Sequence, residues 1–240
     1  MTSFLIAARP RSGSHLLRDC LEKHPDVRCM DECFNRKSVQ NSGKSAEQWF
    51  SEIFAEPKKC SGFILHYDNA RQGKYAEVRA MMKSRDVDYR VLRMHRKDLF
   101  AMYVSKVQAI AKGKWTLWDD EERVPDDVKF EININDMFQY FVNTHNAFMT
   151  DLCEIYVQQP VLPVAYEDMV ESLDSTMSDV WEFLGLKHVR VKPRTVKQVR
   201  KPINQLVENY WDCVEAIRRV ADWKFLLQYK PRWEKAPESV

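Results

Sequence analysis

Apolar positions along the chain follow two spacings, one typical of strands and one of helices. Short continuous apolar runs predict four buried strands, at residues 4–8, 63–67, 89–94 and 161–165. Apolar residues that recur every three or four positions predict helices over residues 16–24, 99–110, 135–156, 177–184 and 202–217. Strands that alternate with helices predict an α/β fold with a central parallel sheet and helices on both faces. Such sheets bind ligands beyond the carboxyl ends of their strands.

Prolines and a glycine mark several of the predicted helix ends. Pro25 and Pro160 stop two of the helical runs, because proline cannot continue a helix. Pro202 is placed to open the last helix and Gly185 to cap the one before it. Since no repeat, low-complexity block or linker interrupts the pattern, we expect a single domain over residues 1–240.

Composition and charge exclude several classes of protein. With 45% hydrophobic and 30% charged residues, the 240-residue chain is globular rather than disordered. Its 37 Lys+Arg and 35 Asp+Glu leave a net charge of +2, which argues against a protein that coats nucleic acid. No two of its 6 glycines form Gly-x-Gly, so the dinucleotide-binding fingerprint is absent.

The cysteines and the chain start argue against a metal and a membrane anchor. The 6 cysteines form no Cys-x-x-Cys pair, and no paired motif at zinc spacing accompanies Cys29 and Cys33. We therefore expect free thiols in a reducing cytoplasm and no metal. The first apolar run meets Arg9 at once and is too short for a signal peptide. No stretch approaches the roughly 18 apolar residues of a membrane span.

The turn between the first strand and the first helix has the residues of an anion cradle. It reads Arg9-Pro10-Arg11-Ser12-Gly13-Ser14-His15. Backbone N–H groups at a helix start are unpaired, and the helix dipole adds partial positive charge there. Gly13 lets the backbone approach a ligand, Ser12 and Ser14 supply hydroxyls, and Arg11 supplies a guanidinium fork. The alternative is a capped helix beside solvated arginines. The Walker A motif is absent, which disfavours an NTP hydrolase.

This turn resembles the phosphosulfate-binding loop of the PAPS-dependent sulfotransferases, in particular bacterial members. These enzymes transfer a sulfuryl group from 3′-phosphoadenosine 5′-phosphosulfate (PAPS) to an acceptor. Residues 10–14 with the two leucines at 16 and 17 carry the likeness, and residues 91–105, 164–186 and 195–210 match the family in the same order. The resemblance covers residues 4 to about 210. It implies a P-loop-NTPase-like fold, PAPS as cofactor with PAP as product, and no metal.

The resemblance assigns cofactor-binding roles along these stretches. Arg96, rather than Arg93, would clamp the 3′-phosphate together with Ser105, although a basic helix start with a buried serine is the alternative. Tyr166 would lie near the adenine, with the acidic pair after it fixing the loop or capping the helix. The basic stretch at 195–201 would close over the nucleotide or form a solvated loop. The expected cofactor-binding residues are Arg9, Arg11, Ser12, Gly13, Ser14, His15, Arg96, Ser105, Tyr166, Lys197 and Arg200.

The resemblance leaves the catalytic base open. Arg11 takes the position of the loop's basic residue, which implies stabilisation of the bridging oxygen and sulfuryl group. Some bacterial members resemble Gly-Glu-Pro-x-x-Phe after the first helix, with the glutamate as base. Glu32 matches that glutamate, although the glycine and proline are missing. Cytosolic animal members use a histidine, and His66 at a predicted strand end is the rival. A third alternative is that neither residue is the base.

The predicted function is transfer to a hydroxyl on a carbohydrate, a glycolipid or a small alcohol. Phe34, Tyr67 and Trp115, with His66, are candidates for the acceptor pocket, because aromatic faces suit a sugar ring or a lipid-like alcohol. A homodimer is left open. One alternative is a kinase-like phosphoryl transferase that uses the same cradle. Another is a non-catalytic nucleotide-binding protein without a working base.

Overall fold

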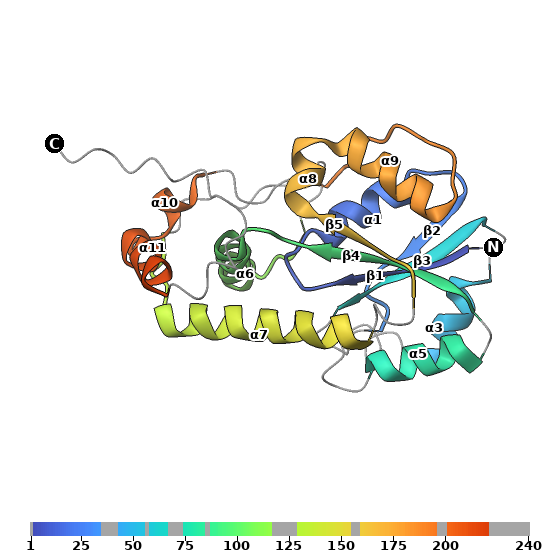
Figure 1. Ribbon diagram of the computed structural model, residues 1–240, viewed down its shortest axis with the longest axis horizontal. Helices are drawn as coiled ribbons and strands as arrows, with labels where there is room; N and C mark the ends of the chain where they lie inside the picture. The colour runs from blue at the N-terminus through green and yellow to red at the C-terminus, as the bar shows by residue number, and fades with distance from the viewer. Residues whose placement is uncertain are drawn as a thin grey trace.

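A five-stranded parallel sheet lies at the centre of the protein (Figure 1). The computed structural model describes residues 2–34, 43–55, 58–66, 74–84, 87–116, 129–154, 159–195 and 201–220. The strands are β1 (Thr2–Ala8), β2 (Val27–Met30), β3 (Cys60–His66), β4 (Tyr89–His95) and β5 (Val161–Ala165). Their order is β2-β3-β1-β4-β5, and every neighbouring pair is parallel. The chain leaves the central β1 toward one side and later crosses to the other, which places the ligand-binding edge at its carboxyl end.

Alternating side chains of β1 pack into two separate cores. Phe4, Ile6 and Ala8 face one side of the sheet, and Leu5 and Ala7 face the other, as the period of two in a strand requires. The first core is covered by α1 (Ser14–Glu22), α8 (Tyr166–Glu171) and α9 (Leu173–Leu184). The second is covered by α3 (Ala46–Ile53) and α5 (Lys74–Ser84). The expected helices on both faces are thus confirmed (Figure 1).

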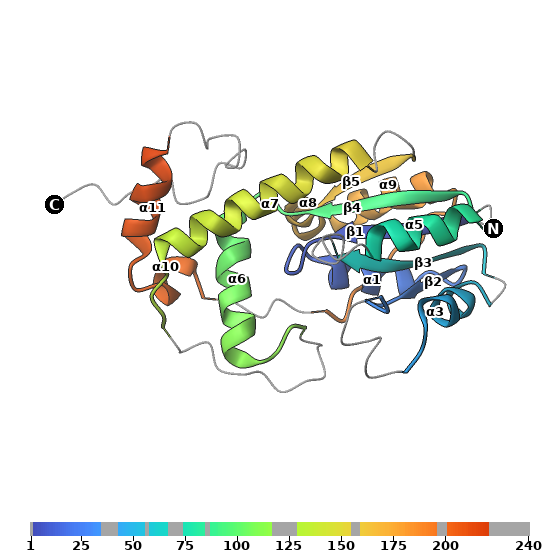
Figure 2. The ribbon, with the colours of Figure 1, turned by 90° about the horizontal axis from the view of Figure 1, so that it is seen from below.

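A third, all-helical core lies beyond the carboxyl edge of the sheet (Figures 1 and 2). It joins α6 (Leu99–Lys112), α7 (Ile134–Glu154), α10 (Ile203–Leu206) and α11 (Tyr210–Arg219). Asn209 ties this core together, because its side chain accepts from the N–H of Ile132 at 2.9 Å and donates to the carbonyl of Ile132 at 2.8 Å. No helix in the described part of the chain is both long and apolar enough to cross a membrane.

The helix predicted over 202–217 is wrong, because the structure divides it into α10 and α11. Val207 leaves the helix to form a parallel bridge with Phe130, and the N–H of Glu208 donates to the Phe130 carbonyl. The four predicted strands are confirmed to within a few residues, and Gly185 caps α9 with a φ of 72°. Among the elements in the described residues, β2, α3, α5 and α8 were not predicted.

Gly62 of β3 pairs with Phe4 of β1, and we predict that alanine at this position destabilises the fold. An added Cβ would meet the Phe4 carbonyl oxygen at 2.3 Å, so the two central strands must move apart. We expect Gly62→Ala to lower the free energy of unfolding by about 2–3 kcal/mol in urea denaturation. Gly113→Ala is the control, because its Cβ meets nothing within 4 Å and only the φ of 64° opposes it, at about 1 kcal/mol. Equal losses in the two variants would contradict the close approach.

Candidate functional site

The loop from β1 to α1 is held tightly at the carboxyl edge of the sheet. Arg11 has a φ of 72° and Gly13 a φ of 101°, both in the left-handed region. A Cβ on Gly13 would lie 2.6 Å from the Tyr166 ring and 2.7 Å from Met94 Cε, so only glycine fits. Ser12 closes the turn by donating its hydroxyl to the Arg9 carbonyl at 2.8 Å. In the described structure no side chain caps α1, so its first N–H groups face this edge without a side-chain acceptor.

Arg11 connects this loop to α6. Its Nε and Nη2 donate to Ser105 Oγ at 3.0 and 2.9 Å, and its Nη1 donates to the Trp115 carbonyl. Burial and the nearby charge of Arg96 lower the pKa of Arg11 to about 10, which leaves it cationic at neutral pH. The structure thus brings together the loop arginine and the helix serine that the sequence assigned to one ligand.

Arg96 lies beside the same loop, at the turn from β4 to α6. Its Nη1 donates to the Arg11 carbonyl at 3.5 Å, and its guanidinium lies 4.6 Å from the centroid of the Tyr166 ring. Glu167 Oε1 is 3.6 Å from Arg96 Nε, and the same carboxylate accepts from the backbone N–H of Lys97 at 2.9 Å. The acidic residue that follows β5 therefore fixes the turn that follows β4, as the sequence suggested for the acidic pair.

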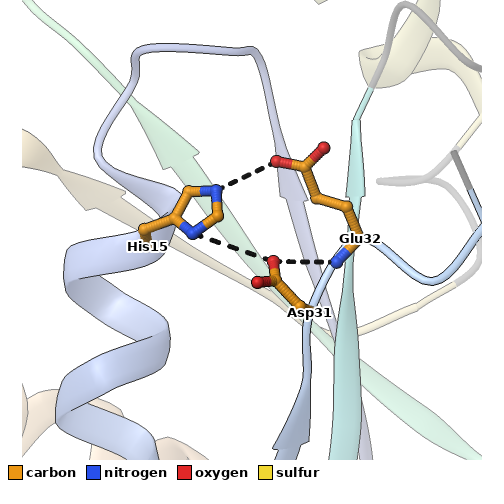
Figure 3. A group of neighbouring side chains, drawn as sticks. All are labelled: His15, Asp31 and Glu32. Atoms are coloured by element: carbon orange, nitrogen blue, oxygen red, sulfur yellow. Dashed lines mark hydrogen bonds and ion pairs between the residues drawn. The ribbon is translucent and has the colours of Figure 1, made fainter. Parts of the chain in front are cut away.

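On the other side of the α1 start, a carboxylate lies between two imidazoles. Glu32 Oε1 is 3.0 Å from His15 Nε2, and Glu32 Oε2 is 3.3 Å from His66 Nδ1. The second nitrogen of His15 is 3.7 Å from Asp31 Oδ1, and the second nitrogen of His66 is 3.3 Å from Ser14 Oγ. Figure 3 shows the His15 ring between the carboxylates of Asp31 and Glu32. Glu32 is 21% exposed and the His66 side chain 8%, so the carboxylate is the more accessible group.

The same cluster contains the metal-ligand types. Within the described residues, His15, Asp31 and Glu32 form the group whose donor atoms all lie within 4.8 Å of one another. Nitrogen and carboxylate donors suit Zn²⁺. In this arrangement each nitrogen of His15 faces a different carboxylate, so hydrogen bonding and ion pairing account for the contacts. Spacing rules overlooked the group because its members come from two elements rather than one motif.

The remaining predicted site residues are core residues, make other contacts, or fall outside the described residues. Phe34, expected in the acceptor pocket, is a core residue that is 3% exposed, and its ring centroid lies 4.9 Å from that of Phe63. Arg9 is buried and donates to the Asn143 carbonyl of α7 at 2.9 Å. Trp115 is 45% exposed. Tyr67, Lys197 and Arg200 fall outside the described residues.

One buried aspartate was missed by the sequence reasoning. Asp19 on α1 accepts from the backbone N–H groups of Arg194 and Thr195 and from the Thr195 hydroxyl. It is 4% exposed and fixes the segment that leads toward the basic stretch. The sequence pattern that could have identified Asp19 is its position beside Cys20 and Leu21, on the apolar side of a helix.

Comparison with solved structures identifies the fold. The structure of a sulfotransferase from Alicyclobacillus acidocaldarius matches with a TM-score of 0.52 and 12% identity, covering 96% of this chain and 97% of that chain. A mouse sulfotransferase complexed with PAP matches more weakly, with a TM-score of 0.43 and 15% identity over 78% of this chain and 59% of that chain. The five-stranded parallel sheet and its helices thus form the sulfotransferase fold, as the sequence predicted.

Sequence comparison gives a distant relative. Protein-tyrosine sulfotransferase A of Caenorhabditis elegans is 27% identical over 195 residues, which is 75% of this chain and 49% of that protein. The chain therefore spans about half the length of this relative. No protein-family model matches the sequence.

Asp98 at this edge gives a prediction about stability and pH. Its side chain caps α6 by accepting from the Ala101 N–H at 2.8 Å, and burial raises its pKa above 3.8. A carboxyl group with a raised folded pKa stabilises the fold when protonated, and this contribution is lost as pH rises through the folded pKa. Asp98→Asn keeps the cap without the charge. We expect it to be more stable than the unaltered protein at pH 7.5, by on the order of 1 kcal/mol, and equal at pH 3.5.

Urea denaturation of both proteins at the two pH values measures this difference. Asp179→Asn serves as the control, because Asp179 is exposed and its variant should differ equally at both pH values. A difference for Asp98→Asn that is the same at pH 3.5 and pH 7.5 would rule out the raised pKa.

Proposed function

We propose that this chain transfers a sulfuryl group from PAPS to an acceptor hydroxyl and releases PAP. The observation that carries the proposal is the grouping around the start of α1. Arg11, Ser105 and Arg96 lie on one side of this helix start, and the Glu32 carboxylate lies on the other. Cations and hydroxyl donors suit phosphate and sulfate oxygens, and a nearby carboxylate suits proton removal. The sulfotransferase fold and the distant tyrosine sulfotransferase relative support the same activity.

The cofactor roles follow the resemblance and the contacts at this edge. The N–H groups of residues 12–15 would hold the 5′-phosphate. Arg96 and Ser105 would hold the 3′-phosphate, with Tyr166 beside the adenine and Lys197 or Arg200 closing over the nucleotide. Arg11 now donates to Ser105, so phosphate oxygens that take up Ser105 free the guanidinium for the sulfuryl group. There it would stabilise the charge that develops on the bridging oxygen.

Glu32 is the base that this arrangement favours. Its carboxylate is partly exposed, whereas His66 is buried and both of its nitrogens are already in contact with side chains. In the transfer step the acceptor oxygen bonds to sulfur while the bond from sulfur to the 5′-phosphate oxygen breaks. Glu32 takes the acceptor's proton, and the leaving oxygen keeps the electron pair as part of PAP.

The acceptor is a hydroxyl, for which the sequence suggests a carbohydrate, a glycolipid or a small alcohol. A second candidate is the phenolic hydroxyl of tyrosine in a peptide, which the name of the distant relative favours. A phenol with a pKa of about 10 loses its proton more readily than an aliphatic alcohol. It would therefore demand less of a carboxylate base.

PAP binding tests the proposed cofactor site directly. PAP should stabilise the protein against heat, by about 2.7 kcal/mol at a hundred times its Kd, and ATP with Mg²⁺ should not. Arg96→Ala should weaken PAP binding about 10- to 100-fold, because a charge-assisted contact to the 3′-phosphate is lost. Binding of 5′-AMP, which lacks that phosphate, should change by about twofold at most. Calorimetry on both ligands measures the difference.

Arg190→Ala is the matched control, because Arg190 is an exposed arginine far along the chain from these contacts and should leave both affinities unchanged. No response to millimolar PAP would sink the proposal. Stabilisation by ATP with Mg²⁺ instead would favour the kinase-like alternative.

Transfer from labelled PAPS tests the reaction and the base. The panel should contain sugars, glycolipids, small alcohols and tyrosine peptides. We expect Glu32→Gln to bind PAP like the unaltered protein but to lose turnover at least 100-fold, because the amide cannot take the acceptor's proton. Full activity in Glu32→Gln would remove Glu32 as the base. PAP binding without transfer to any acceptor would favour a non-catalytic binding protein.

A further inference from the structure

Two histidines hold opposite oxygens of the Glu32 carboxylate. His15 comes from the first turn of α1 and approaches Oε1 at 3.0 Å, and His66 ends β3 and approaches Oε2 at 3.3 Å. Glu32 itself follows β2, so three elements meet at one carboxylate. Figure 3 shows the His15 half of this arrangement.

His66 is also held at its far nitrogen, and the far nitrogen of His15 lies near a second carboxylate. His66 Nε2 is 3.3 Å from Ser14 Oγ, and both residues are buried. His15 Nδ1 is 3.7 Å from Asp31 Oδ1, and the other oxygen of Asp31 is 3.9 Å from Arg18 Nη1. Polar contacts therefore run from Ser14 in the anion cradle through His66 and Glu32 to His15, and the exposed Asp31 lies next to His15.

The chemistry of the groups fixes the direction of these hydrogen bonds. An ionised carboxylate only accepts, so His15 Nε2 and His66 Nδ1 carry the hydrogens that face Glu32. A neutral His66 then has a lone pair on Nε2, and the Ser14 hydroxyl donates to it. Ser14 thus offers an anion its backbone N–H, while its hydroxyl hydrogen is directed at His66.

We propose that His15 and His66 are positioning residues, which hold the Glu32 carboxylate in one orientation and link it through Ser14 to the anion cradle. This inference rests on the proposed function, in which Glu32 is the base. A carboxylate has about four lone-pair sites, so two histidine donors do not by themselves exhaust its capacity to accept hydrogen bonds. The two imidazoles come from different elements, so together they restrict the direction in which the Glu32 carboxylate points.

Alanine and amide variants of both histidines test the proposal. His15→Ala and His66→Ala should lower kcat about 10- to 100-fold and change the KM for PAPS less than about threefold. The acid limb of the pH profile of kcat should move up by about one pH unit, because the charged base loses a donor. His66→Asn and His15→Gln place an amide N–H near the lost ring nitrogen and should restore most of kcat. His188→Ala is the control, because His188 is exposed and is not one of the residues around Glu32.

Three results would overturn the positioning role alone while the unaltered protein still transfers sulfuryl groups. One is a His66→Asn variant as impaired as His66→Ala, which would make His66 an acid or base. Another is an acid limb that does not move in either alanine variant. The third is activity lost with EDTA and regained with Zn²⁺, which would assign the cluster to a metal ion. Absence of transfer by the unaltered protein would instead overturn the proposed function, and the positioning role with it.

Nitrogen-15 NMR of the imidazoles tests the same proposal, beginning with the unaltered protein. In the unaltered protein at pH 7.5, His66 should carry its hydrogen on Nδ1, and His15 should carry one on Nε2. In Glu32→Gln both resonances should shift, while those of His188 stay in place. A His66 hydrogen on Nε2 alone would overturn the proposed chain.

Discussion

The contact of Gly13 with the Tyr166 ring and Met94 is the constraint on which the rest of the site depends. It leaves no room for a Cβ, so the loop after β1 must lie flat against residues that end β4 and begin α8. The same tyrosine ring stacks on Arg96, and Glu167 beside it binds the N–H of Lys97. The carboxyl ends of three strands are thereby held at one edge by side chains rather than by the sheet alone. The left-handed backbone of Arg11 is tolerated because this frame leaves the loop no other path.

At this carboxyl edge of the sheet, the positive and negative side chains lie on opposite sides of the start of α1. Burial, together with repulsion from the nearby charge of Arg96, lowers the pKa of Arg11. A dianionic ligand relieves that repulsion, so the cost of crowding the cations becomes part of the binding energy for an anion. On the other side, Glu32 is surrounded by imidazoles and another carboxylate. The net charge of the whole chain, +2, does not reveal this arrangement, because only a few of the charged residues take part in it.

The fold was readable from the sequence because its central strands are long and apolar and its helices keep their period. The β1–α1 loop was readable for a related reason, since its residue types suit one kind of ligand and it follows a recognisable strand. The sequence did not predict β2, because this strand has only 4 residues and two of them are half-buried. The sequence did not predict the break between α10 and α11, because this break depends on a bridge from Val207 to Phe130, which lies 77 positions earlier. His66 was readable as a strand-end histidine, but its contacts with Glu32 and Ser14 depend on how three elements meet, which spacing along one chain does not encode.

The segment around Glu32 explains how a glutamate can be oriented there without the glycine and proline that flank it in the pattern it resembles. In that pattern the proline would restrict the backbone of the glutamate before it. Here the Glu32 N–H donates to Asp31 Oδ1 at 2.8 Å, and the Cys33 N–H donates to the Asp31 carbonyl at 2.7 Å. Cys33 and Phe34 are then buried in the core beneath the sheet and hold the segment from the other end. The core position of Phe34, unexpected for a pocket residue, thus serves the site indirectly, because it fixes the backbone from which Glu32 reaches the helix start.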